Sequence, residues 1–480
     1  MDLLEKIGQL FVVPARGDVA RHVRDNHIGG VIWFESTTRA TAETNAQLQS
    51  LAKTPLLISA DLEAGMGMRF TDADWWPSAM AIAATGDPSF AEEEGRVTAR
   101  EALAIGVNHI LAPVADVNVD PQNPVINTRS FGEDPHDVAR YVAAFVRGVQ
   151  SEGCLATAKH FPGHGDTHID SHRALPLLDV TRERLDAVEL VPFRAAIDAG
   201  VASVMMAHLA IPSLGDGDLP ATLSPNIIRL LRETLGFNGL VITDSFDMAG
   251  LTTHFAPGEA AVRAVEAGED QILFSIDTDA AIAAVHDAVR SGRISTARID
   301  ESVERIMFAK RSCGAAGSQP AGLSRETRRA ESPPLHRIAQ RAVTLLRDDD
   351  HLLPLKTNVT AIVVTDAPEP NPLEEAVRAL QPQRVITIDA NSGDVEVEDG
   401  IIVMLLALRP ISGAGRIALP GAAKRLARRQ VIAISFGSPY VLRDFRTAVC
   451  AYGIQPVMQR AAIRAIRGEA PMSGRLPVTL

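Results

Sequence analysis

The sequence predicts an α/β protein, with a (β/α)8 TIM-like barrel followed by a smaller α/β/α layered sandwich domain. The chain has 480 residues, which is more than one hydrophobic core usually organises. Short apolar runs alternate with amphipathic stretches as far as residue 311. The composition then changes, and a second series of apolar runs begins after residue 335. These observations indicate two domains, of which the first is the barrel.

Eight short apolar runs are the candidate barrel strands. They are rich in β-branched and other apolar residues, as strands buried in a parallel sheet are. In chain order they are Leu10–Val13, Gly30–Trp33, Leu56–Ala60, Asn108–Ala112, Leu155–His160, Ser203–His208, Leu240–Asp244 and Gln271–Phe274. Between them, stretches such as Phe90–Ile105, Pro135–Glu152 and Thr181–Ala199 repeat apolar residues every three or four positions. That spacing predicts surface helices.

The expected barrel covers residues 1–311. Residues 312–334 are rich in Gly, Ala, Ser, Pro and Arg and lack apolar periodicity, which predicts a linker. The second domain is expected over residues 335–480, with a helical pattern at Pro372–Leu380. Its candidate strands are Thr360–Thr365, Val385–Asp389, Ile401–Leu406 and Val431–Ser435. Alternation of the two patterns predicts a layered α/β domain.

Composition and charge exclude several classes of protein. Apolar residues make up 46% of the chain and charged residues 22%, as in ordinary globular proteins. The formal net charge of -12 argues against a nucleic-acid or membrane partner, either of which would require a basic stripe. Three scattered cysteines are too few for a disulfide framework. Residues 1–17 lack the basic start, apolar stretch and small-residue cleavage site of a signal peptide, so we expect none. We therefore expect a cytoplasmic protein and leave its oligomeric state open.

Polar residues at the ends of the predicted strands mark the functional face. In a (β/α)8 barrel the chemistry lies where strands end and loops begin. The residues in such positions here are Asp61, Asp116, His160, His208 and Asp244. We expect a site built from several of them.

The segment Lys159–His172 contains four histidines and two aspartates within fourteen residues. A metal site is one explanation, but its ligands would all come from a single loop that contains Gly and Pro. We therefore expect no metal and no cofactor. The other explanation is proton chemistry, in which Asp170 accepts a hydrogen bond from one nitrogen of His172 and leaves the other free to protonate a departing oxygen. A purely structural Asp–His hydrogen bond also fits the pattern.

Residues 159–176 resemble the signature loop of glycoside hydrolase family 3 β-N-acetylglucosaminidases, whose pattern runs K-H-F-P-G-H-G-D-T, then D-S-H and L-P. Val241–Gly250 resembles the nucleophile strand of the same family. Two further segments, Asp61–Gly65 with Arg69 and Asn127–Gly132, are similar to the family's D-x-E-G-G, R-F and R-S-F-G motifs. The resemblance covers essentially the whole barrel.

The resemblance implies roles for individual residues. Asp244 falls on the nucleophile, and His172 takes the place of the general acid and base, with Asp170 orienting it. The implied sugar-binding residues are Asp61, Arg69, Arg129, Lys159 and His160, with Met206 and His208 as weaker lining candidates. Ser245 and Phe246 depart from the family's S-D-D-L pattern, and Leu62, Ala64 and Met66 from its D-Q-E-G-G-R run. Because these residues lie beside the implied sugar site, the departures leave the reaction type unchanged but bear on which sugar is bound, so β-glucosides are also candidate substrates.

The implied function is that of a retaining, exo-acting β-N-acetylglucosaminidase. It would remove terminal β-linked N-acetylglucosamine from muropeptides or chitin-type oligosaccharides through a covalent glycosyl-enzyme. One alternative is a phosphorylase, because an imidazole would not repel an approaching phosphate dianion. Others are a non-catalytic carbohydrate-binding barrel and a metal-dependent hydrolase. The second domain resembles the one that accompanies many family 3 barrels, down to its closing residues Ser473–Leu480, and its role stays open.

Overall fold

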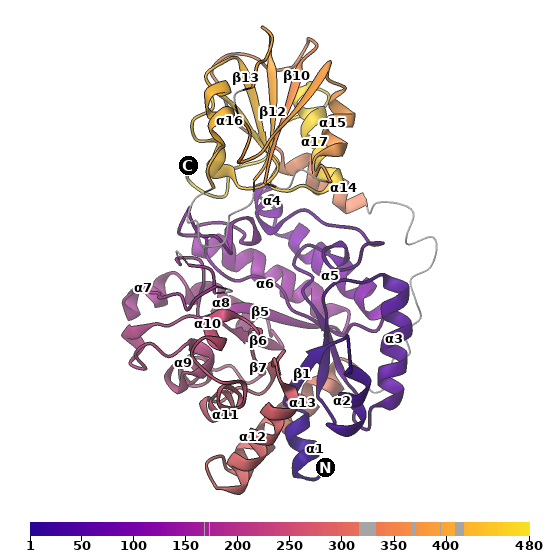
Figure 1. The fold of residues 1–480 in the computed structure, drawn as a ribbon, viewed down its shortest axis with the longest axis vertical. Coiled ribbons are helices and arrows are strands. Elements are labelled where there is room, and N and C mark those ends of the chain that lie inside the picture. The colour runs from indigo at the N-terminus through magenta and orange to yellow at the C-terminus, as the bar shows by residue number, and fades with distance from the viewer. Residues whose placement is uncertain (168, 172, 316–332, 367–369, 394, 409–416) are drawn as a thin grey trace. The chain divides into compact units, whose positions relative to one another are not determined.

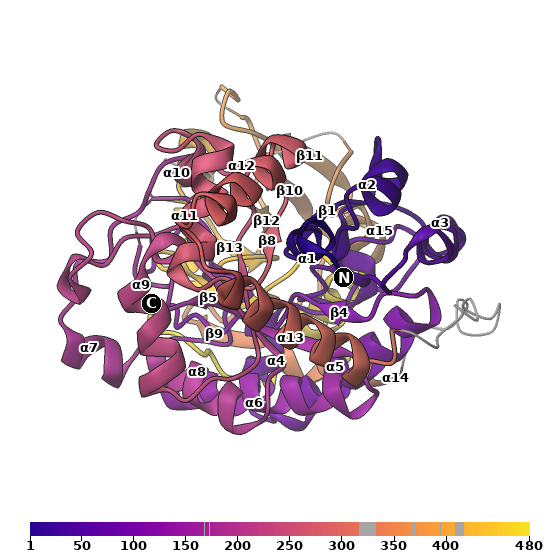
Figure 2. The same ribbon diagram turned by 90° about the horizontal axis from the view of Figure 1, so that it is seen from below.

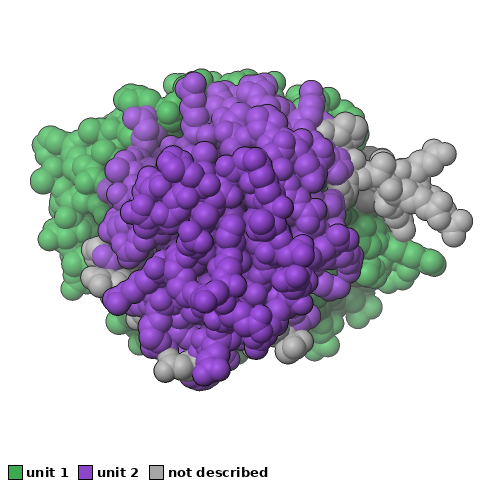
Figure 3. Space-filling model, turned by 90° about the horizontal axis from the view of Figure 1, so that it is seen from above, with its two compact units in different colours: residues 1–75, 91–117, 135–330 green, residues 76–90, 118–134, 331–480 purple. Residues whose placement is uncertain are grey.

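The computed structural model describes residues 1–480 except 168, 172, 316–332, 367–369, 394 and 409–416 (Figure 1). The chain divides into two compact units, which Figure 3 shows in different colours. The first unit comprises residues 1–75, 91–117 and 135–330, and the second comprises 76–90, 118–134 and 331–480. Two segments within the expected barrel range therefore belong to the second unit. Most of the expected linker, residues 316–332, lies outside the described residues.

The first unit contains an eight-stranded parallel sheet, as the sequence predicted. Its order is β7-β6-β5-β4-β3-β2-β1-β8, and a bridge between Ile242 and Gln271 joins the two ends. Figure 2 gives a view of the chain from below. The strands are β1 (Phe11–Pro14), β2 (Gly30–Trp33), β3 (Leu57–Ala60), β4 (His109–Ile110), β5 (Leu155–Phe161), β6 (Ser203–Met206), β7 (Leu240–Thr243) and β8 (Ile272–Leu273). Nearly all strand residues are buried, because the sheet is covered on its outer face and filled with side chains inside.

Helices follow the strands and surround the sheet. They are α1 (Leu3–Gly8), α2 (Val19–Asp25), α3 (Thr38–Leu51), α5 (Ser89–Ala104), α6 (Pro135–Ser151), α7 (Arg182–Ala187), α8 (Leu190–Asp198), α9 (Pro225–Arg229), α10 (Ala249–Thr252), α11 (Pro257–Ala267), α12 (Thr278–Arg290) and α13 (Thr296–Ser312). Side-chain caps begin several of them: Asp2 forms a capping box with Glu5, and Ser295 accepts from the amide of Arg298. None of the described helices is long and apolar enough to cross a bilayer.

The helix expected over Thr181–Ala199 is divided into α7 and α8. Val188 leaves helical geometry with φ −126° and ψ −72°, and α8 restarts at Leu190. Pro192 lies in the first turn of α8, where its missing N–H costs nothing. In a continuous helix its ring would clash with the carbonyl of residue 188, so the proline explains the break.

The second unit contains a six-stranded sheet of order β11-β10-β12-β13-β14-β9, in which only β9 is antiparallel to its neighbour. The strands are β9 (Thr344–Asp348), β10 (Thr360–Thr365), β11 (Arg384–Ile388), β12 (Ile402–Ala407), β13 (Val431–Ser435) and β14 (Thr447–Cys450). The helices are α4 (Ala79–Ala84), α14 (Pro333–Ala342), α15 (Glu374–Leu380), α16 (Gly421–Leu426) and α17 (Pro456–Ile466). Figure 1 shows α16 on one side of the sheet and α15 with α17 on the other. The layered α/β fold is confirmed, with β9 and β14 in addition to the expected strands.

Candidate active site

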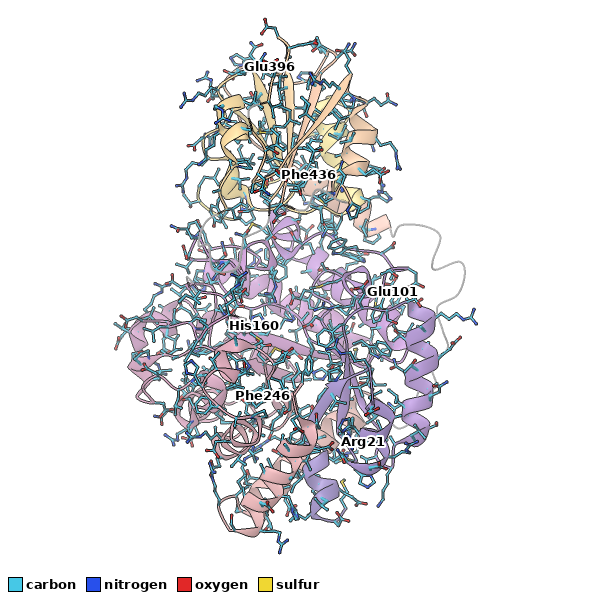
Figure 4. The ribbon with its side chains drawn as sticks, viewed as in Figure 1. Arg21, Glu101, His160, Phe246, Glu396 and Phe436 are labelled. Atoms are coloured by element: carbon cyan, nitrogen blue, oxygen red, sulfur yellow. The ribbon has the colours of Figure 1, made fainter. Side chains whose placement is uncertain are left out.

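The carboxyl ends of three barrel strands bring polar side chains to one rim. Asp61 directly follows the last residue of β3, Lys159 and His160 lie within β5, and Asp244 directly follows β7. Because parallel strands all end on the same face of a barrel, these side chains share a rim although they are far apart in sequence. Figure 4 labels His160 within the barrel.

Asp61 is the centre of a partly buried ion-pair network. Its carboxylate accepts from Nζ of Lys159 at 2.8 Å and from Nη2 of Arg69 at 2.7 Å. Lys159 is only 2% exposed and also pairs with Glu63 at 2.6 Å. Burial alone would raise the pKa of Asp61, but Lys159 and Arg69 lower it, and the net shift is downward. The network therefore holds an ionised carboxylate on the rim.

Asp116 organises the start of the histidine-rich loop. It is fully buried and lies after β4, the strand beside β5. One carboxylate oxygen accepts from Nδ1 of His160 at 2.8 Å, and the other accepts from the amide of His164 at 2.6 Å. The amide of His160 donates to the same carboxylate at 3.3 Å. Sequence reasoning noted Asp116 at a strand end but gave it no role.

The loop after β5 is fixed by close contacts of its own. The ring of His164 bonds Oγ1 of Thr167 at 2.7 Å and Oγ of Ser171 at 3.0 Å. Burial lowers the pKa of His164 to about 4, so the ring is neutral near pH 7. Gly165 must be a glycine, because a Cβ there would lie 1.7 Å from the carbonyl oxygen of Val117.

The same loop is tied to the segment that carries Asp244. The carbonyl of Ser171 accepts from the amide of Gly250 at 3.0 Å, and a Cβ on Gly250 would lie 2.8 Å from that oxygen. Gly250 lies in α10, which follows Asp244 by a few residues. The two segments that resemble family motifs are therefore in direct contact.

Asp244 is held from both sides. Its amide donates to the carbonyl of Met206 in β6 at 3.0 Å, and its own Oδ1 accepts from the amide of Ser245 at 2.7 Å. Burial alone would raise the pKa of Asp244, but the imidazoles of His160 and His208 lower it, with help from the Ser245 amide. The net shift is downward. A half-buried, ionised and oriented carboxylate of this kind is suited to attack an electrophilic carbon.

His208 and Met206 lie behind Asp244. His208 is fully buried; its Nδ1 lies 2.7 Å from Oγ1 of Thr222, and its Nε2 donates to the carbonyl of Ser245 at 2.9 Å. Its ring centroid lies 5.7 Å from that of Phe246, which Figure 4 labels. Met206 ends β6 and is also fully buried. His208 thus supports the backbone that follows Asp244.

The remaining candidate residues lie elsewhere in the chain. Asp170 is buried, and its carbonyl accepts from the amides of Arg173 at 2.9 Å and Ala174 at 3.2 Å. His172, its expected partner, lies outside the described residues. Arg129 belongs to the second unit, where its Nη1 donates to the carbonyl of Val125 at 3.1 Å. The rim site described above thus unites Asp61, Arg69, Lys159, His160 and Asp244 within the first unit.

The described residues contain no group of three or more His, Cys, Asp or Glu side chains arranged to hold a metal ion. The rim instead offers two ionised carboxylates, a buried ammonium group and a buried imidazole. Such groups bind the hydroxyls of a polar ligand through charge-assisted hydrogen bonds. Among the described residues, no lysine or arginine forms an ion pair with Asp244, which leaves this carboxylate available as a nucleophile.

Comparison with known proteins gives a consistent result. Residues 2–309 match the model of the glycosyl hydrolase family 3 N terminal domain. A beta-N-acetylglucosaminidase/beta-glucosidase from Cellulomonas fimi is 31% identical over 99% of this chain and 93% of its own length. The structure of a glycoside hydrolase family 3 beta-N-acetylglucosaminidase from Paenibacillus superposes with a TM-score of 0.90 at 33% identity, covering 100% and 99% of the two chains. A beta-glucoside phosphorylase superposes with a TM-score of 0.91 at 26% identity, covering 100% and 94%.

Proposed function

The chain belongs to glycosyl hydrolase family 3 and is a glycoside hydrolase, and from this premise we propose that it is a retaining, exo-acting β-N-acetylglucosaminidase. It removes terminal β-linked N-acetylglucosamine from an oligosaccharide. The names of the Cellulomonas and Paenibacillus relatives support this sugar. The aglycone is a muropeptide or a chitin-type oligosaccharide. We also propose a cytoplasmic location, which three free and buried cysteines support.

One observation carries the mechanism: the carboxylate of Asp244 is half-buried, ionised and fixed by backbone hydrogen bonds at the end of β7. In the proposed first step, one of its oxygens attacks the anomeric carbon while the bond to the leaving oxygen breaks. A covalent glycosyl-enzyme forms, and water then displaces Asp244 from the same carbon. Two displacements at one carbon retain its configuration.

We assign the proton transfers to His172 and Asp170. His172 protonates the leaving oxygen in the first step and accepts a proton from water in the second. Asp170 accepts a hydrogen bond from the other ring nitrogen and stabilises the imidazolium form. Two observations on neighbouring residues support the assignment: Asp170 is buried, and Ser171 contacts the amide of Gly250 in the segment after Asp244.

The sugar would bind to the charged groups on the rim. Asp61 accepts hydrogen bonds from two sugar hydroxyls, and Lys159 and His160 donate to others. Arg69 holds Asp61 in place, since it already donates to that carboxylate at 2.7 Å. Arg129 is a further proposed contact, and Met206 and His208 are proposed to line the site from behind Asp244.

Phosphorolysis is the second candidate for the glycosyl-enzyme step. The similarity to a beta-glucoside phosphorylase at a TM-score of 0.91 favours testing it. With the imidazole of His172 as the general acid in place of a carboxylate, an approaching phosphate dianion would not be repelled by a second negative charge. Hydrolysis is the first candidate, because both of the other relatives named above are glycosidases by name.

The test is product analysis with nitrophenyl β-N-acetylglucosaminide, with and without phosphate. Wild type, Asp244→Asn and Asp25→Asn are compared, and products are identified by mass spectrometry. Asp25 is exposed at the end of α2, on the opposite face of the barrel from the rim, so its variant controls for charge. Hydrolysis predicts free sugar in both buffers and no turnover by Asp244→Asn. A sugar 1-phosphate as the main product in phosphate buffer would show that the enzyme is a phosphorylase. Full activity of Asp244→Asn would show that Asp244 is not the nucleophile.

A further inference from the structure

Three neighbouring strands carry an aromatic and cationic cluster at the rim. Arg16 follows β1, Phe34 directly follows β2, and Phe274 directly follows β8. The strands are adjacent in the sheet, in the order β2-β1-β8. The cluster is therefore on the same face of the barrel as Asp61 and Asp244, which follow β3 and β7.

The geometry of the cluster is well defined. The ring centroids of Phe34 and Phe274 are 5.8 Å apart, with 52° between the ring planes. The guanidinium carbon of Arg16 lies 5.7 Å from the Phe34 centroid and 5.4 Å from the Phe274 centroid. Backbone hydrogen bonds hold the supporting segments, because the amide of Ala15 donates to Ile32 and that of Phe274 donates to Val12, both at 2.8 Å. Both rings are partly exposed, so the cluster presents an apolar surface to solvent.

Arg16 is an exposed cation without a carboxylate partner among the described residues. The acids nearest to the cluster in sequence, Asp18 and Glu35, are both exposed, and neither pairs with it in the part of the chain that is described. Arg69 differs: its guanidinium carbon lies 5.8 Å from the Phe34 centroid, but it donates to Asp61 at 2.7 Å. Phe34 thus lies between Arg69, which is paired with Asp61 at the sugar site, and Arg16, which has no carboxylate partner among the described residues.

We propose that Arg16, Phe34 and Phe274 form a subsite for the leaving group and that Arg16 binds a carboxylate on it. The partly exposed rings pack against the apolar face of a pyranose, and the guanidinium forms a bidentate hydrogen bond with the carboxylate. A neutral N-acetylglucosamine unit would use only the rings. An acidic leaving sugar uses both features, so the subsite selects acidic over neutral aglycones. This inference rests on the proposed function, because the subsite has meaning only beside a sugar cleaved at Asp244.

The test compares two disaccharides that differ by one charge. The first is N-acetylglucosamine β-linked to N-acetylmuramic acid, and the second is the methyl ester of that acid. The kcat/KM ratio of acid to ester is measured for wild type, Arg16→Ala, Arg16→Lys and Arg24→Ala. Arg24 is an exposed arginine on α2, on the opposite face of the barrel, so its variant controls for net charge. Nitrophenyl β-N-acetylglucosaminide serves as the reference substrate for wild type.

Wild type and Arg24→Ala are expected to prefer the acid by about tenfold, as one charge-assisted bidentate contact implies. In Arg16→Ala the acid-to-ester ratio falls close to one. In Arg16→Lys it is intermediate, because lysine keeps the positive charge but cannot form the bidentate hydrogen bond. A wild-type ratio near one, or an unchanged ratio in Arg16→Ala, overturns the subsite while leaving the proposed function intact. A wild type that releases no sugar from the nitrophenyl substrate overturns the proposed function, and the subsite falls with it.

Discussion

Nδ1 of His160 donates to the carboxylate of Asp116 at 2.8 Å, and both residues are buried beside the proposed sugar site. The contact determines the tautomer of His160, since a ring that donates from Nδ1 keeps Nε2 for other partners. Asp116 also accepts from the amides of His160 and His164. The Asp116 carboxylate therefore fixes the orientation of the His160 ring, the backbone at His160 and the start of the loop at His164.

Asp116→Asn should abolish most activity. An amide has only one accepting oxygen and would direct its NH2 group at one of the three donors. We expect kcat/KM for the nitrophenyl substrate to fall roughly 100-fold, the effect of a displacement of about 1 Å in a catalytic group. Circular dichroism of the variant provides the control for folding. Activity within threefold of wild type would show that Asp116 does not position His160.

Lys159→Met should destabilise the protein. Its ammonium group neutralises Asp61 and Glu63, and its removal leaves buried carboxylates without that partner. Breaking a buried ion pair in this way costs about 3–5 kcal/mol in the free energy of unfolding. Urea unfolding measures the loss. The double variant Lys159→Met with Glu63→Gln should recover part of this loss. Equal stability of the single variant and wild type would show that the ion pairs of Lys159 do not stabilise the fold.

Stability should fall as the pH is lowered from 6.5 towards 4. Burial lowers the pKa of both His109 and His164 to about 4. The unfolded chain takes up these protons near pH 6.5, whereas the folded chain stays neutral until about pH 4, so acid favours unfolding. Each histidine contributes on the order of 2–3 kcal/mol to the loss at pH 4. Among the described residues, the ring of His109 bonds the hydroxyls of Thr157 and Ser203, which lie near the start of their strands and away from the rim, so His109 gives the clearer test.

Urea midpoints at pH 7 and pH 5 check this dependence in wild type and in His109→Gln. The glutamine variant should show a smaller difference between the two pH values, because one titrating group has been removed. An equal pH dependence in the two proteins would assign the acid sensitivity to other groups.

The sequence predicted the barrel and most of its strands correctly. The reason is physical: each barrel strand is buried on both faces and therefore reads as an unbroken apolar run, as in Leu240–Thr243. The strands β9 and β14 were not predicted. Thr344–Asp348 contains charged residues and is partly exposed, so its pairing with β14 depends on tertiary contacts that a local pattern does not carry.

The site was predicted less completely than the fold. Motifs predicted Asp61, Lys159, His160 and Asp244 as site residues, because they stand at strand ends inside long family patterns. The roles of Asp116 and of Glu63 as buried partners were not predicted, since each acts across strands on a residue distant in sequence. Arg16 was also overlooked, because an arginine near a strand end has no distinguishing pattern until the two rings beside it are known.

Loss of the proposed acid should depend on the leaving group. His172→Ala should reduce hydrolysis of a β-linked N-acetylglucosamine disaccharide by roughly 100-fold or more, within the range of general acid catalysis. Substrates with a dinitrophenol leaving group need no protonation, so their first step should be nearly unaffected. Measuring kcat/KM on both substrates tests this. Equal losses on the two substrates would exclude His172 as the acid.

The most direct test of the account is to identify the residue that carries the sugar. A slow fluorinated N-acetylglucosaminyl donor is incubated with wild type, and the digested protein is analysed by mass spectrometry. A covalent intermediate on Asp244 predicts a sugar adduct on the peptide that contains this residue and none in Asp244→Asn. An adduct on a different residue, or turnover of the donor without any adduct at a detectable level, would contradict a covalent intermediate on Asp244.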